Sequence, residues 1–68
     1  MNNTFGERLK ELRKEKNIGQ ITLAKELGVG KSIISLWENN ECESTLSKLV
    51  AIAKFFGVST DYLCGFEE

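Results

Sequence analysis

The side chains best suited to bind another molecule lie in one short stretch of this 68-residue chain. Lys31, Ser32, Ser35 and Leu36 recur at a spacing that gathers them on one face of a helix. An ammonium group and two hydroxyls can donate to phosphates and to base edges, and a leucine can contact a thymine methyl group. The chemistry indicated is recognition rather than catalysis.

These side chains need two helices to position them. Residues 20–27 have the apolar spacing of an amphipathic helix. Gly28 can take the left-handed conformation that ends a helix in a tight turn. The chain then restarts as a second helix over 31–38, and the small side chain of Ala24 lets the two helices cross at close range. Two helices joined in this way predict a helix-turn-helix, which can present its second helix to a DNA major groove.

The remaining residues describe one all-α domain, spanning 1–68, without repeats or linkers. Its N-terminal helix carries Phe5, Leu9 and Leu12 at helical spacing, and Gly57 ends a later helix. The five expected helices lie near 4–16, 20–27, 31–38, 45–56 and 60–64.

Several apolar residues are assigned by spacing. Trp37 is expected in the core, and Cys64, which follows Leu63, is expected to be a small core residue. Phe55 and Phe66 are candidates for a self-association surface. The apolar stripe of helix 45–56 is expected to comprise Leu46, Leu49, Val50, Ala53 and Phe56.

The composition restricts the class of protein. The net charge of −1 argues against non-specific polyanion binding, although residues 1–16 carry a net +2 and residues 39–68 a net −3. No apolar run is long enough to span a membrane and no export leader is present, which predicts a cytoplasmic protein. With no His, two isolated Cys and no phosphate-cradling glycine loop, we expect no metal, no cofactor and no enzymatic activity.

With the whole pattern laid out, the chain resembles the Cro and phage-repressor-like (Xre-type) helix-turn-helix family. The resemblance covers about 5–65. It is carried by Phe-Gly-Glu-Arg-Leu-Lys-Glu-Leu-Arg at 5–13, Gln20, Leu23-Ala24, Leu27-Gly28-Val29, Ile34-Ser35, Trp37-Glu38 and Gly57-Val58-Ser59-Thr60-Asp61-Tyr62-Leu63. It implies a five-helix, lambda-repressor-like DNA-binding domain of prokaryotic or phage origin, which binds double-stranded DNA as a homodimer.

The resemblance also implies roles for individual residues. Gln20 matches a glutamine that contacts phosphate and packs toward the recognition helix. Lys31, Ser32 and Leu36 match groove-facing positions, with Ser35 at their edge. Arg13 and Glu38 match a semi-buried ion pair that holds helix orientation, and Asn39 and Asn40 match a loop whose backbone amides approach phosphate.

The chain departs from the family pattern at its DNA-facing helix starts. Gly30 and Gly19 stand where the family usually has a capping hydroxyl, although backbone amides can still bind phosphate there. Glu41 and Glu43 lie in the loop expected near the DNA backbone, where their charge would reduce affinity.

Two functions are therefore carried forward. The first is a sequence-specific DNA-binding transcriptional regulator, most simply a repressor acting as a dimer on a palindromic operator. The alternative is a protein-interaction module of the same fold that binds a partner through Ile33 and Leu36, which the acidic loop favours.

Overall fold

Each segment whose apolar residues recur at helical spacing forms a helix in the computed structural model, which describes residues 4–66. Five helices, and no strand, occur in this range, which confirms the expected all-α architecture. Residues 1–3 and 67–68 of the expected domain lie outside the described part. The helices are α1 (Thr4–Glu15), α2 (Gln20–Leu27), α3 (Lys31–Glu38), α4 (Leu46–Phe56) and α5 (Thr60–Cys64).

The same turn is used twice, after α2 and after α4. Gly28 and Gly57 adopt left-handed φ values of 72° and 70°. The following valines bond back to the helix, with Val29 N 3.0 Å from Ala24 O and Val58 N 3.0 Å from Ala53 O. A hydrogen bond from an N–H to the C=O five residues earlier is typical of the Schellman motif, in which a glycine ends the helix because it has no Cβ to strain the left-handed conformation. The glycine positions therefore fix where α2 and α4 stop.

Two helix ends differ by one residue from the expected bounds. Asn17 takes a left-handed φ of 62°, so that regular helix α1 stops at Glu15. Thr45 has extended backbone and lies outside α4, where its hydroxyl accepts from Lys48 N at 3.2 Å. Thr45 is thus the N-cap of α4, one of the two caps expected from the sequence beside Ser44, because the capping hydroxyl needs that extended conformation.

The core lies where all five helices meet. Leu9, Leu23, Ile34, Ile52 and Leu63 are fully buried, one from each helix. Trp37 is 3% exposed, which confirms its assignment to the core, and its ring meets that of Phe5 edge-on.

The expected stripe of α4 is wrong in part. Leu46 is 76% exposed and Val50 is 36% exposed, whereas Ile52 is fully buried. The buried face follows Leu49, Ile52, Ala53 and Phe56 at spacings of three and four. Val50 falls on the flank of that face, and Leu46 is the first residue of α4.

The expectation for Cys64 is also wrong. Cys64 is exposed and Cys42 is half-buried, and both are free thiols. Leu63 is the buried residue of α5, whereas Cys64, the last residue of that helix, lies on its exposed side. Phe55 is half-buried, with its ring edge-on to Phe56 and Lys16 above it, whereas Phe66 is 81% exposed.

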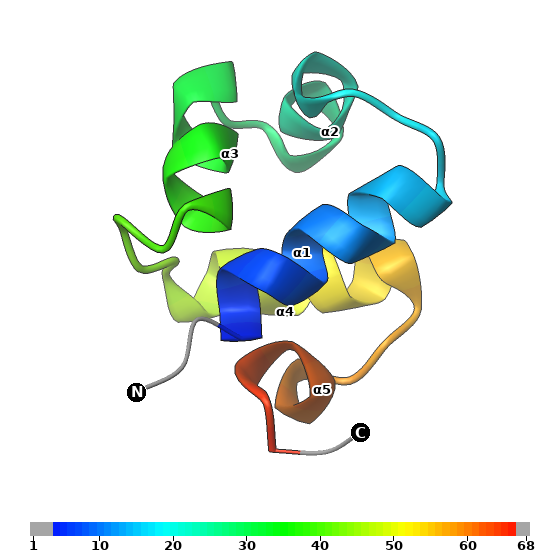
Figure 1. The fold of residues 1–68 in the computed structure, drawn as a ribbon, viewed down its shortest axis with the longest axis vertical. Helices are drawn as coiled ribbons and strands as arrows, with labels where there is room; N and C mark the ends of the chain where they lie inside the picture. Colours follow the sequence, from blue (N-terminus) through cyan, green and yellow to red (C-terminus); the bar gives the residue numbers. More distant parts are fainter. Residues whose placement is uncertain (1–3, 67–68) are drawn as a thin grey trace.

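The arrangement leaves α2 and α3 together at one end of the molecule, with α5 at the other (Figure 1). α3 packs against α2 and α1, while α5 packs against α1 and α4. In the view of Figure 1, α3 runs along the page and α2 is seen nearly end-on, so the two helices cross steeply. None of the helices described combines the length and the hydropathy needed to cross a membrane.

Candidate nucleic-acid interface

The outer face of α3 carries the side chains singled out for binding. Lys31 and Ser32 are exposed in its first turn, and Ser35 and Leu36 are half-buried farther along. On the inner face, Ile34 is fully buried and Trp37 nearly so. Because the apolar side of α3 packs against the core, the exposed first turn of α3 is held in one position.

The first turns of α2 and α3 have no side-chain cap. Gly19 and Gly30 occupy the N-cap positions in extended conformation, without a side-chain hydrogen bond. By contrast, Thr45 caps α4, and the hydroxyl of Ser59 accepts from Tyr62 N at 3.0 Å in α5. α2 and α3 lie together at one end of the domain (Figure 1), and first-turn amides without a side-chain cap can bind an acceptor group.

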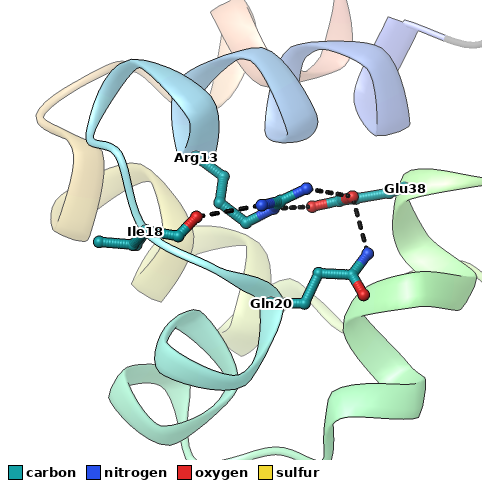
Figure 2. A network of polar contacts seen from close by, with 4 residues as sticks. All are labelled: Arg13, Ile18, Gln20 and Glu38. Carbon is teal, nitrogen blue, oxygen red and sulfur yellow. Dashed lines mark hydrogen bonds and ion pairs between the residues drawn. The ribbon is translucent and has the colours of Figure 1, made fainter.

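A polar network joins α1, α2 and α3 beneath this surface (Figure 2). Arg13 Nε lies 2.6 Å from Glu38 Oε2, and Arg13 Nη2 lies 3.1 Å from Oε1. The two side chains are 12% and 3% exposed, respectively. This two-pronged, charge-assisted contact is the strongest geometry available to such a pair.

The same network reaches the start of α2. Arg13 Nη1 donates to Ile18 O at 3.0 Å, in the connector after α1. Gln20 Nε2 donates to Glu38 Oε1 at 3.0 Å. The resemblance implied the Arg13–Glu38 pair, which the structure brings together, but it did not place Gln20 on Glu38. No spacing in the sequence signals that bond, because the path of the connector decides it.

The loop after α3 makes more hydrogen bonds within the domain than the resemblance implied. Asn39 N donates to Ser35 O, and Asn40 N donates to Trp37 O, both at 3.0 Å. Asn40 has a left-handed φ of 58°, and its Oδ1 accepts from Gly6 N at 3.1 Å. Both backbone amides expected to approach phosphate thus already donate within the domain. The exposed side chain of Asn39 remains available to solvent.

Two long cations that the sequence analysis did not single out hold the helices in place. Lys48 Nζ donates to Leu27 O at 3.1 Å, so α4 anchors the C-terminal end of α2. Arg8 Nη1 donates to Tyr62 O at 2.8 Å, and its guanidinium lies 4.2 Å from the centre of the Tyr62 ring. In the sequence, Lys48 and Arg8 look like ordinary solvated charges, so only the packing of the helices identifies their structural role.

Charge on this side of the domain is mixed. Lys31 is exposed at the start of α3, while Glu41 and Glu43 are exposed in the loop after it. Among residues 4–66, no group of three His, Cys, Asp or Glu side chains could hold a metal ion. The arrangement offers hydrogen-bond donors and a small apolar contact on the outer face of α3.

A helix-turn-helix family model matches residues 9–63. The chain is 41% identical over 64 residues to the transcriptional activator BcrR of Enterococcus faecalis, covering 94% of this chain and 31% of that protein. It is 41% identical over 59 residues to repressor protein C2 of Salmonella phage P22, covering 87% of this chain and 27% of that protein. The chain therefore spans about a third or less of the length of these two relatives.

Solved structures agree with these relatives. The crystal structure of the P22 c2 repressor in complex with a synthetic operator aligns with a TM-score of 0.87 at 38% identity, covering 93% of this chain and 96% of that one. The solution structure of the DNA-binding domain of the same repressor aligns with a TM-score of 0.84. The family model and the fold agree over nearly the whole described range. The chain belongs to the Xre/Cro-like helix-turn-helix family.

Proposed function

We propose that this chain is the sequence-specific DNA-binding domain of a transcriptional regulator, acting as a repressor in the cytoplasm of a bacterium. The observation that carries the proposal is the outer face of α3. Lys31 and Ser32 are exposed in its first turn, on a scaffold that aligns with an operator-bound repressor at a TM-score of 0.87. The mechanism is steric, since a protein held in the major groove of a promoter blocks polymerase.

In this proposal α3 enters the major groove. Lys31 and Ser32 contact phosphate or base edges, and Leu36 lies against thymine methyl groups, with Ser35 at the edge of the contact. The uncapped first turns after Gly19 and Gly30 approach the DNA backbone through their amides. The side chains of Gln20 and Asn39 complete the contact surface.

A single domain of this size makes few contacts, so we propose that two copies bind together. Two recognition helices would then occupy successive major grooves, ~34 Å apart, on a palindromic operator. Phe66, 81% exposed, together with Leu46 and Val50 on α4, supplies apolar surface outside α3 for self-association.

The test is selection of bound duplexes from a randomised DNA pool, followed by rebinding across a salt series. The proposal expects an enriched palindrome with half-sites spaced about one helical turn apart. Failure to enrich any sequence, or binding that vanishes at moderate salt, would reject sequence-specific recognition by this domain.

One observation favours the alternative of a protein-binding module. Ile21 on α2 is 58% exposed, and Ile33 and Leu36 on α3 are half-buried at the surface. If no duplex is enriched, Leu36→Asp and Ile33→Asp should abolish capture of a protein partner, while leaving the far-UV circular dichroism spectrum unchanged.

A further inference from the structure

We propose that Glu38 is a positioning residue for DNA recognition, which holds one Nε2 proton of Gln20 inward and leaves the other as the donor for a DNA phosphate. The inference rests on the proposed function, because it concerns the same surface. It assigns to a buried carboxylate at the end of α3 an effect on a polar group at the start of α2, 18 residues earlier in the chain.

The charge of Glu38 decides which end of the Gln20 amide faces inward. A carboxylate only accepts hydrogen bonds, and a carboxamide has a donor end and an acceptor end. Gln20 Nε2 lies 3.0 Å from Glu38 Oε1, and the flipped amide would set two acceptor oxygens against each other. The chemistry of the pair therefore fixes the amide orientation.

The other end of the amide is open to solvent. Gln20 is half-buried, and every buried side-chain nitrogen or oxygen among residues 4–66 has a hydrogen-bond partner. None of the hydrogen bonds in that range involves Gln20 Oε1, so this oxygen is not buried. Figure 2 shows it directed away from Glu38. The outward edge of Gln20 thus presents one acceptor oxygen and the remaining N–H of Nε2.

Glu38 can hold this orientation because it is itself immobilised. Its carboxylate receives Arg13 Nε at 2.6 Å and Arg13 Nη2 at 3.1 Å, and its side chain is 3% exposed. Arg13 also holds Ile18 O at 3.0 Å, two residues before Gln20. The connector before α2 and the side-chain amide of its first residue are therefore tied to the same pair.

An anchored glutamine binds more tightly than a mobile one. Ordering a free side chain on binding lowers affinity by roughly three- to tenfold. Without Glu38 as an acceptor, Gln20 would have to be ordered by the DNA, and either end of its amide could face outward. Glu38 removes this loss without contacting DNA.

The experiment is a double-mutant cycle on affinity for the selected operator, at a temperature at which circular dichroism shows every variant of the 68-residue chain folded. Glu38→Gln keeps the shape but leaves a single acceptor oxygen for Arg13 and Gln20 to share, and Gln20→Met keeps the length without polar atoms. We expect Glu38→Gln to weaken binding about three- to tenfold in the parent chain and less than about twofold in the Gln20→Met background. Equal losses in both backgrounds would overturn the positioning role.

A matched control separates this effect from net charge. Glu26→Gln removes one negative charge from an exposed position on α2 and should leave affinity unchanged or slightly raised. Glu38→Gln removes the same charge but should weaken binding, so a gain in affinity would also overturn the inference. If Glu38→Gln does not fold, nuclear Overhauser contacts between the Gln20 Nε2 protons and the Glu38 side chain in the parent chain decide the matter; their absence would overturn it.

The two proposals fail in different ways. If the parent chain enriches no duplex, the proposed function fails and the positioning role falls with it. If the parent chain binds its operator but the cycle is additive, only the positioning role fails.

Discussion

At the scale of single residues, the polar side chains near α3 divide into two groups. Glu38, Gln20 and Asn40 form hydrogen bonds within the domain, while Lys31 and Ser32 face solvent. Substitutions in the first group should lower stability, because they leave a partner unsatisfied, in addition to the effects on binding proposed for Glu38 and Gln20. Substitutions of Lys31 and Ser32 should act on binding alone.

Arg13→Ala tests the first group by removing the partner of Glu38. It leaves the Glu38 carboxylate 3% exposed and without its cation, so we expect the free energy of unfolding to fall by about 3 kcal/mol. Urea denaturation measures this, and thermal unfolding should show a clearly lower midpoint. Lys14→Ala, at the exposed neighbouring position, is the control and should change stability little. Equal stability of the two variants would contradict a structural role for the pair.

Lys31→Ala tests the second group. If Lys31 contacts phosphate, its loss should weaken operator binding and reduce the slope of log K against log salt by about one, with no change in thermal stability. Fluorescence anisotropy across a salt series measures the slope. Lys54→Ala removes the same charge from the exposed surface of α4 and should leave the slope unchanged. A slope equal to that of the parent chain would move the interface away from Lys31.

At the scale of elements, α1 and α3 meet at a glycine. A Cβ at Gly6 would lie 2.6 Å from Trp37 O and 2.7 Å from Glu38 O, both backbone atoms that cannot move freely. Gly6 N also donates to the side chain of Asn40, which satisfies one of the first-turn amides of α1. The close approach of these helices therefore depends on the missing side chain.

Gly6→Ala should destabilise the domain by about 1–3 kcal/mol, because the methyl group overlaps the end of α3. Helix propensity alone predicts the opposite sign, a gain of roughly 1 kcal/mol. Chemical denaturation decides between them, with Lys10→Ala on the exposed face of α1 as a neutral reference. A more stable Gly6→Ala variant would show that α1 and α3 are farther apart than described.

Gly30→Ser should stabilise the domain. The backbone at Gly30 has an ordinary φ of −81°, and the nearest atom to an added Cβ is Ser32 Oγ at 3.9 Å, so a side chain fits without strain. A serine hydroxyl can cap α3 and restricts the unfolded chain, together worth about 0.5–1 kcal/mol. Differential scanning calorimetry should show a higher midpoint, and a lower one would mean that the N-cap geometry is wrong.

At the scale of the whole molecule, the proposed dimer makes a prediction about stoichiometry. A palindromic operator should bind two chains, and a duplex carrying one half-site should bind one chain with an affinity at least about tenfold lower. Electrophoretic mobility and sedimentation measure both quantities. A one-to-one complex on the palindrome, or equal affinity for the two duplexes, would show that this chain binds as a monomer.

Much of the fold could be predicted from the sequence because its signals are local. The positions of α2 and α3 follow from apolar spacing and from Gly28. The spacing between Ile34 and Trp37 along the chain predicts that Trp37 lies in the core, which the structure confirms. The predictions that were wrong concern single apolar residues, Leu46 and Val50 on α4 and Cys64 in α5. Leu46 has core-like spacing but lies in the first turn of α4, and Cys64 neighbours a buried residue without sharing its face.

The sequence by itself determined the helices, their turns and the face of α3 that carries Lys31 and Ser32, because backbone conformation and side-chain direction within one helix depend on near neighbours. Only the tertiary structure decided the polar contacts between distant residues that neither spacing nor the resemblance implied. Gly6 and Asn40 are 34 residues apart, and Gln20 and Glu38 are 18 apart. Such contacts depend on how helices pack against a shared core, which no local pattern specifies.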